Sequence, residues 1–204
     1  MNIYDINIAS LSGEENMLSG LSGKVCMFIN ITTKSGYTPK CSNLWSYART
    51  ARSLWDLQTL HEMFGERGFS VVGVPCNQFG GQEPSANKQI SAFVKAHYPF
   101  VSFPITEKIE VNGPNEHELY TALKGVQRRR KDDNRANGGS EAEIGQNLAN
   151  QALARIPHNG EKFIVGRHGG VLMRFGWAEK PLADEPLTIA ASWTVKEAIN
   201  EILG

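Results

Sequence analysis

The sequence has few cysteines, no long apolar run and no net charge. Three cysteines among 204 residues, an odd and small number, argue against a disulfide scaffold and are typical of a reducing compartment. No stretch approaches the roughly 20 apolar residues of a membrane-spanning helix. The start, residues 1–5, lacks the basic and apolar regions of a signal peptide. The 21 basic and 21 acidic residues cancel, which gives no electrostatic footprint for nucleic acid or an anionic membrane. We therefore expect a cytoplasmic protein without nucleic-acid or membrane partners.

Sequence motifs that bind a metal ion or a phosphate group are also missing. The five histidines show no His-x-x-x-His spacing. The Gly-Gly pairs lack the phosphate-loop pattern and indicate turns. We therefore expect no metal and no bound cofactor. An apolar content of 41% and a length of 204 residues predict one soluble domain with a full core.

Apolar patterning predicts an α/β architecture. The run at 24–31 is nearly continuous, as in a strand buried on both faces. A helix containing Leu57, Leu60 and Phe64 precedes a second strand. The remaining predicted elements are a strand at 69–75, a helix at about 85–97, a strand at 104–111, a hairpin at 162–166 and 171–175, and a helix at 195–203. Connection handedness places the loop after the first strand at the carboxyl edge of the sheet.

The most specific segment of the chain, 74–84, reads Val-Pro-Cys-Asn-Gln-Phe-Gly-Gly-Gln-Glu-Pro. It follows a predicted strand, and its Gly-Gly turn is expected to leave Gln82 and Glu83 exposed at the sheet edge where α/β proteins hold ligands. The segment resembles the Cys-Asn-Gln-Phe-Gly-x-Gln-Glu signature of the glutathione peroxidase family. Further segments that resemble family blocks lie at 30–39, 103–105, 108–113, 117–120 and 161–166.

The resemblance implies a thioredoxin-like fold: a central mixed sheet flanked by helices, with an N-terminal hairpin that residues 3–5 resemble and a first core strand that starts at residues 23–25. The whole chain, 1–204, would be one such domain with inserts at about 41–55 and 125–157. The implied activity is thiol-dependent reduction of hydrogen peroxide or organic hydroperoxides. The external reductant would be glutathione or a thioredoxin-like protein.

Ser35 stands where family enzymes carry the reactive cysteine or selenocysteine. A cysteine thiol ionises near pKa ~8.5, and its surroundings can lower that value to roughly 3.5–7.5. A serine hydroxyl needs an adjacent base to act as a nucleophile, and oxygen has no counterpart of the sulfenic acid stage. We therefore expect that the Ser35 chain does not turn over peroxide. The serine is either an engineered trap or a natural loss.

Three further site residues follow from the resemblance. The family surrounds its sulfur with Gln, Trp and Asn, which donate hydrogen bonds to the thiolate and to the leaving oxygen. Gln82 matches the glutamine and Asn159 the asparagine. His158 stands at the tryptophan position, and Gly160 replaces an aromatic residue. His158 is either a donor at the site or a polar loop residue without a role.

The cysteines differ in their expected roles. Cys26 and Cys76 lie within or directly after predicted strands and are expected to be buried and unreactive. Family members reduced by thioredoxin-like proteins often carry a resolving cysteine at the position of Val94, where none is present. Cys41 is therefore a possible resolving cysteine for a sulfur at position 35, or an ordinary loop thiol.

The first insert is expected either to lengthen the following helix or to cover the site as a lid. The second contains a capping-box pattern at Ser140 and Glu143 followed by an amphipathic run. That run packs on its own domain or on a second copy, so a homo-oligomer is possible.

The sequence leaves two further classes of function to consider. One is a non-catalytic pseudo-peroxidase that acts as a binding or regulatory protein, which the changes at Ser35, His158 and Gly160 favour. The other is a serine hydrolase using Ser35 and His158. The sequence disfavours it, since the Gly-x-Ser-x-Gly elbow and an orienting acid are missing.

Overall fold

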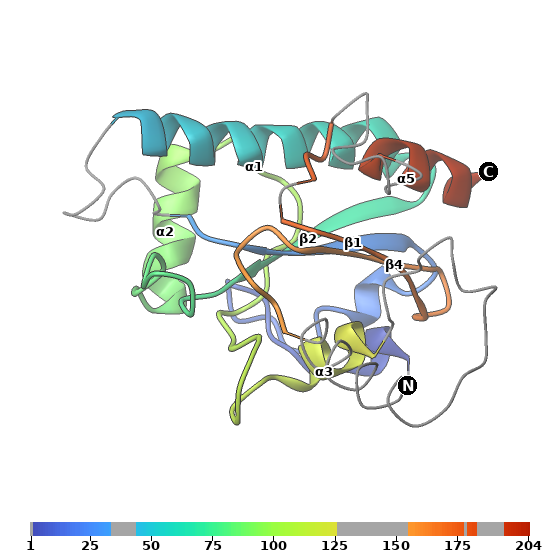
Figure 1. The fold of residues 1–204 in the computed structure, drawn as a ribbon, viewed down its shortest axis with the longest axis horizontal. Helices are drawn as coiled ribbons and strands as arrows, with labels where there is room; N and C mark the ends of the chain where they lie inside the picture. Colours follow the sequence, from blue (N-terminus) through green and yellow to red (C-terminus); the bar gives the residue numbers. More distant parts are fainter. Residues whose placement is uncertain (1, 34–43, 126–154, 178, 183–193) are drawn as a thin grey trace, which may run out of the picture.

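The computed structural model describes residues 2–33, 44–125, 155–177, 179–182 and 194–204, with the backbone alone for 44–52. At its centre lies a four-stranded mixed sheet with the strand order β2-β1-β3-β4 (Figure 1). The strands are β1 (Val25–Ile31), β2 (Phe69–Pro75), β3 (Lys162–Val165) and β4 (Val171–Phe175). β1 pairs in parallel with β2 and antiparallel with β3, and β3 and β4 form an antiparallel hairpin. The predicted α/β class, the two core strands and the hairpin are confirmed.

Helices and loops cover both faces of the sheet (Figure 1). On one face, apolar side chains of α1 (Leu44–Gly65), α2 (Asn87–His97) and α5 (Val195–Leu203) pack with Met27 and Ile29 of β1. On the other, α3 (Glu118–Lys124) and the N-terminal segment pack with Cys26 and Phe28. Every residue of β1 is buried, which explains its continuous apolar sequence. No helix in the described part of the chain is both long and apolar enough to cross a membrane.

Helix α1 begins at Leu44, earlier than the pattern around Leu57 indicated. Most of the first predicted insert therefore continues this helix, in line with the first of its two expected roles. Residues 41–43 lie outside the described residues, as does the second predicted insert between 126 and 154.

The predicted strand at 104–111 is wrong. The segment makes two isolated bridges, Ile105 with Gly73 and Thr106 with Ser10, and no continuous ladder. Its other backbone donors bind separate parts of the chain: Ile109 N–H donates to the Pro75 carbonyl, and Lys108 N–H donates to the Asn87 side chain. Apolar alternation reports which residues are buried, and here the burial is achieved without regular strand pairing.

The predicted N-terminal hairpin is also not found in residues 2–25. The short 3₁₀ helices η1 (Ile3–Asp5) and η2 (Ser19–Leu21) precede β1 instead. The Asn2 side chain caps η1, and the buried Tyr4 hydroxyl donates to carbonyls of Lys24 and Gly166. The segment is therefore held by side-chain bonds to the ends of β1 and β3.

Candidate active site at the carboxyl end of β1

Two parallel strands end side by side at one edge of the sheet. Ile31 at the end of β1 is in register with Pro75 at the end of β2. The chain then continues from β1 into Thr32 and Thr33, and from β2 into the glycine-rich segment identified above. The carboxyl edge of parallel strands is the usual place for ligands in such sheets. The predicted site residues follow these strands or precede β3, which is the neighbour of β1 on its other side.

A buried carboxylate joins the two strand ends. Glu83 is fully buried, and its Oε2 accepts hydrogen bonds from the backbone N–H and, at 2.7 Å, from the hydroxyl of Thr33. The Thr33 carbonyl accepts from the Tyr98 hydroxyl at 3.2 Å. Glu83 Oε1 is buried without a hydrogen-bond partner among the described residues. The expected exposure of Glu83 is therefore wrong: the carboxylate is turned inward because it satisfies the polar groups of Thr33.

Gln82 lies half-buried beside this carboxylate, in a turn that only glycine accommodates easily. Gly80 and Gly81 have φ angles of 69° and 61°, in the left-handed region. A Cβ at Gly80 would lie 3.7 Å from Gln82 Cγ. The predicted Gly-Gly turn is thus present. It brings the Gln82 side chain back over Gly80.

Asn30 connects β1 to the loop before β3. Its side chain is fully buried, and its Nδ2 donates to the His158 carbonyl at 3.0 Å and to Asn159 Oδ1 at 3.2 Å. The backbone N–H of Gly160 donates to the Asn30 carbonyl at 2.7 Å. Gly160 has a φ of 96°. The loss of an aromatic side chain at this position therefore accompanies a left-handed turn that side chains rarely adopt.

Asn159 leaves a hydrogen-bond donor unused. Its Oδ1 binds Asn30, while its Nδ2 is buried with no partner among the described residues. A buried, unsatisfied amide N–H costs about 1–3 kcal/mol. Such groups recur where a ligand completes the bonding. This donor is therefore suited to bind an oxygen atom of a substrate.

His158 is exposed, and its ring contacts two aromatic rings. Its ring stacks on Phe79, with centroids 6.0 Å apart, and lies 5.2 Å from the ring of Trp177. Its Nδ1 lies 3.1 Å from the Asn159 carbonyl oxygen. When Nδ1–H donates to this carbonyl, Nε2 is the ring atom that faces no described polar partner.

Gln82 and Asn159 thus lie in two loops that are both bonded to residues 30–33. Ser35 and Cys41 lie outside the described residues, so their place relative to these side chains stays a prediction. Sequence reasoning missed the positioning roles of Asn30, Thr33 and Glu83. Asn30 carried a usable signal, because it is a polar residue inside a continuous apolar strand, where burial requires partners.

The two described cysteines are structural, as predicted. Cys26 and Cys76 are fully buried and free. Burial raises the pKa of Cys26 from 9.0 to about 11, against smaller opposing effects of Tyr4 and Lys24. Burial also raises the pKa of Cys76. Neither thiol forms the thiolate that peroxide chemistry requires near neutral pH.

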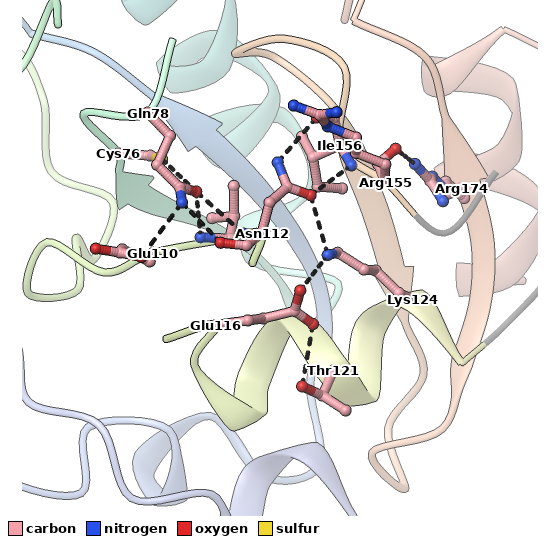
Figure 2. A network of polar contacts seen from close by, with 11 residues as sticks. Cys76, Gln78, Glu110, Asn112, Glu116, Thr121, Lys124, Arg155, Ile156 and Arg174 are labelled. Atoms are coloured by element: carbon pink, nitrogen blue, oxygen red, sulfur yellow. Dashed lines mark hydrogen bonds and ion pairs between the residues drawn. The ribbon is translucent and has the colours of Figure 1, made fainter. Parts of the chain in front are cut away.

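A polar network around Gln78 and Asn112 connects the loop after β2 with the segment that precedes β3 (Figure 2). Gln78 Oε1 accepts from the backbone N–H groups of Val111 and Asn112 at 2.8 and 3.0 Å. The Asn112 side chain binds the N–H and the carbonyl of Ile156 at 2.9 and 3.0 Å. Its Oδ1 also accepts from Lys124 Nζ. The loop after β2 and the segment that leads to Asn159 are therefore fixed to one central loop.

Comparison with known proteins agrees with this geometry. The family model described as glutathione peroxidase matches residues 3–124. The chain is 35% identical over 180 residues to the hydroperoxy fatty acid reductase gpx1 of Synechocystis, covering 88% of this chain and 89% of that protein. It is 32% identical over 203 residues to the glutathione peroxidase homolog BsaA of Halalkalibacterium halodurans, covering all of both chains.

Solved structures share the fold. The crystal structure of Trgpx in its apo form superposes with a TM-score of 0.61 at 24% identity, covering 100% of this chain and 95% of that one. Trypanosoma cruzi GPX1 gives 0.57 at 22% identity, covering 100% and 95%. Xanthomonas campestris peroxiredoxin Q gives 0.52 at 13% identity, covering 99% and 94%. The fold is thioredoxin-like, and the chain belongs to the glutathione peroxidase family.

Proposed function

We propose that this site is the hydroperoxide-reducing centre of a thiol-dependent peroxidase in which an oxygen, from Ser35, replaces the reactive sulfur. The observation that carries the proposal is the attachment of two loops to the end of β1, directly before position 35. Glu83 binds Thr33, and Asn30 binds the loop of Asn159. This arrangement supports amide donors around a nucleophile at position 35.

The reaction requires sulfur. A thiolate at position 35 attacks the terminal oxygen of ROOH, the O–O bond breaks, and sulfur loses two electrons to become a sulfenic acid. The leaving alkoxide takes a proton and departs as ROH. One external thiol then displaces the sulfenic oxygen as water and forms a mixed disulfide, and a second thiol releases the thiol at position 35 with a disulfide as product. Amide groups of Gln82 and Asn159 stabilise the thiolate and the developing alkoxide.

The Ser35 chain binds peroxide without reducing it, since a serine oxygen offers no sulfenic acid stage. The substrate class in this proposal is hydrogen peroxide and organic hydroperoxides, and the reductant is glutathione or a thioredoxin-like protein. The names of relatives support this class: one is a hydroperoxy fatty acid reductase, and a yeast relative is a glutathione peroxidase-like peroxiredoxin. No bound metal or cofactor is needed. The small cysteine content favours a reducing, cytosolic setting.

The test restores the sulfur and measures its reaction. Stopped-flow mixing of the Ser35→Cys protein with hydrogen peroxide should oxidise position 35 at least about 100-fold faster than a free thiol. Adding Gln82→Ala or Asn159→Ala should slow this step roughly 100-fold, because each removes a donor. Asn200→Ala, at an exposed position of α5 whose side chain binds Arg67, is the matched control and should leave this rate unchanged. A sulfur that reacts no faster than a free thiol would instead support the non-catalytic pseudo-peroxidase, which the serine at position 35 favours.

Cys41 decides how the sulfenic acid is resolved. We propose a disulfide between positions 35 and 41 in the Ser35→Cys protein, which requires Cα atoms within about 7 Å. Peptide mapping after peroxide treatment should give the linked peptide and indicate a thioredoxin-type reductant. A persistent sulfenic acid or a glutathione adduct, with Cys41 free, would contradict the resolving role.

A further inference from the structure

Three aromatic rings form a continuous surface next to Asn159. Phe79 comes from the loop after β2, His158 from the loop before β3, and Trp177 from the segment after β4. The His158 ring contacts both others, at 6.0 and 5.2 Å between centroids. Trp177 is 54% exposed. We call the three side chains the aromatic shelf.

A buried lysine holds two of the three shelf loops together. Lys162 is 1% exposed, and its Nζ donates to the Gly160 carbonyl at 2.6 Å and to the Gly176 carbonyl at 3.0 Å. Gly160 lies two residues after His158, and Gly176 directly precedes Trp177. Burying an ammonium group is costly unless it is fully hydrogen-bonded. The position of Trp177 against His158 is therefore built into the fold, not left to an unattached surface side chain.

The shelf and Asn159 together offer two kinds of contact. The rings provide an apolar surface, and the buried Nδ2 of the neighbouring Asn159 is a donor without a partner among the described residues. A ligand that fits both has an apolar or aromatic body and an oxygen atom at one end. Three side chains are too few for a protein partner, because stable interfaces bury about 800 Å² on each side. A small amphiphilic molecule is the occupant that this pairing fits.

We propose that the aromatic shelf binds the organic body of bulky hydroperoxides, with the peroxide oxygens reaching the Asn159 amide. Only the placement of the peroxide group rests on the proposed function. The apolar contact is argued from the three aromatic rings and does not depend on that function. The shelf then favours hydroperoxides with an aromatic or extended apolar body over hydrogen peroxide, which has no group to place on it.

Binding is tested first on the Ser35 protein, where no chemistry intervenes. The probe is 2-phenyl-2-propanol, the alcohol that corresponds to cumene hydroperoxide, observed by saturation-transfer NMR. Its phenyl protons should receive saturation, and Trp177→Ala should remove this signal. Trp177→Phe should retain it, since a phenyl ring keeps the stacking surface. The matched control is Trp55→Ala, which removes a similarly exposed tryptophan (57%) from α1, where its ring contacts Phe100.

Kinetics of the Ser35→Cys protein give the second test. With Trp177→Ala added, the rate constant for cumene hydroperoxide should fall about tenfold, which corresponds to about 1.4 kcal/mol of transition-state stabilisation. The rate constant for hydrogen peroxide should stay the same. Trp55→Ala should affect neither.

The two proposals fail in different ways. If Ser35→Cys reacts with neither peroxide but the alcohol still binds through Trp177, the peroxidase proposal is wrong and the shelf stands. If Ser35→Cys reduces both peroxides and Trp177→Ala changes neither the rates nor the NMR signal, the shelf proposal is wrong. Equal loss with both peroxides would also overturn it, because it would mark Trp177 as a purely structural residue.

Discussion

The Glu83 carboxylate accepts hydrogen bonds from both the backbone N–H and the hydroxyl of Thr33. This pair joins the loop that carries Gln82 to the chain that leads to position 35. Its bonding lies inside the protein, with both residues fully buried. The two chain segments are therefore joined at a single buried carboxylate oxygen.

Removing this carboxylate should destabilise the protein. Glu83→Ala leaves two buried donors of Thr33 without an acceptor, so we expect a loss of about 2–4 kcal/mol in the free energy of unfolding. Glu83→Gln keeps one oxygen that accepts both bonds and should cost about half as much or less. Urea denaturation of both variants measures the difference. Equal losses for the two variants would show that Thr33 does not depend on this oxygen.

The buried ion pair between β4 and the start of β3 should show strong coupling. Arg174 Nε lies 2.8 Å from Glu161 Oε1, and both side chains are almost fully buried. Arg174→Met should cost about 3–5 kcal/mol, because the remaining charge is buried with fewer partners. The double variant with Glu161→Gln should cost clearly less than the sum of the two single changes. Additive losses in a denaturation series would argue against direct pairing.

Lys162 should make stability depend on pH. Burial lowers its pKa from 10.5 to about 8, opposed by the Glu161 and Glu179 carboxylates. Between these values the unfolded chain binds more protons, so the contribution of Lys162 to stability rises with pH through this window and is lost as the pH falls to 8. Relative to Lys162→Met, the parent should gain about 2 kcal/mol between pH 7.5 and pH 10.

Cys26 is present in both the parent and Lys162→Met. Its titration lowers the stability of both proteins as the pH rises above 9, so this effect cancels in the difference between them. Lys88→Met, at an exposed position on α2, serves as the control for replacing a lysine by methionine. If the stability difference between the parent and Lys162→Met did not vary with pH, burial would not lower the pKa of the Lys162 ammonium group.

Two of the three cysteines should resist alkylation in the folded protein. The pKa of Cys26 is raised to about 11 by burial, and that of Cys76 is also raised. At pH 8 both remain thiols without access to solvent, so iodoacetamide should modify neither within minutes. In urea both should react at once. Mass spectrometry of tryptic peptides measures each site, and rapid labelling of Cys26 in the folded state would contradict the buried strand position.

The elements that could be predicted from the sequence are those whose buried residues recur at the spacing of a strand or a helix. β1, β2, the terminal hairpin and α5 are in their expected places because each shows its burial directly in its pattern. The strand predicted at 104–111 was wrong for the same reason. Its apolar residues are buried, but its backbone N–H groups bind acceptors scattered along the chain. Glu107 and Ile109 donate to the carbonyls of Ala9 and Pro75, and other donors bind the Asn87 and Gln78 side chains, an arrangement that no period reveals.

The site was predictable only as far as a motif marks it. The resemblance names Gln82 and Asn159 as site residues, which stays a prediction. It gives no sign of Asn30 and Glu83, which act through bonds between segments far apart in the chain. Such bonds depend on how loops meet after folding. The aromatic shelf is of this kind, because Phe79, His158 and Trp177 share no sequence pattern.

Asn112 uses one amide group at both margins of the segment 126–154. Its Oδ1 accepts from Lys124 Nζ before the segment and from the Ile156 N–H after it. The two ends of the described chain, on either side of residues 126–154, are therefore held by the same side chain. For a flexible connection between two ends fixed in this way, doubling the length costs only about 0.6 kcal/mol in closure entropy. We therefore expect changes of chain length between Lys124 and Ile156 to leave the sheet and the two site loops in place.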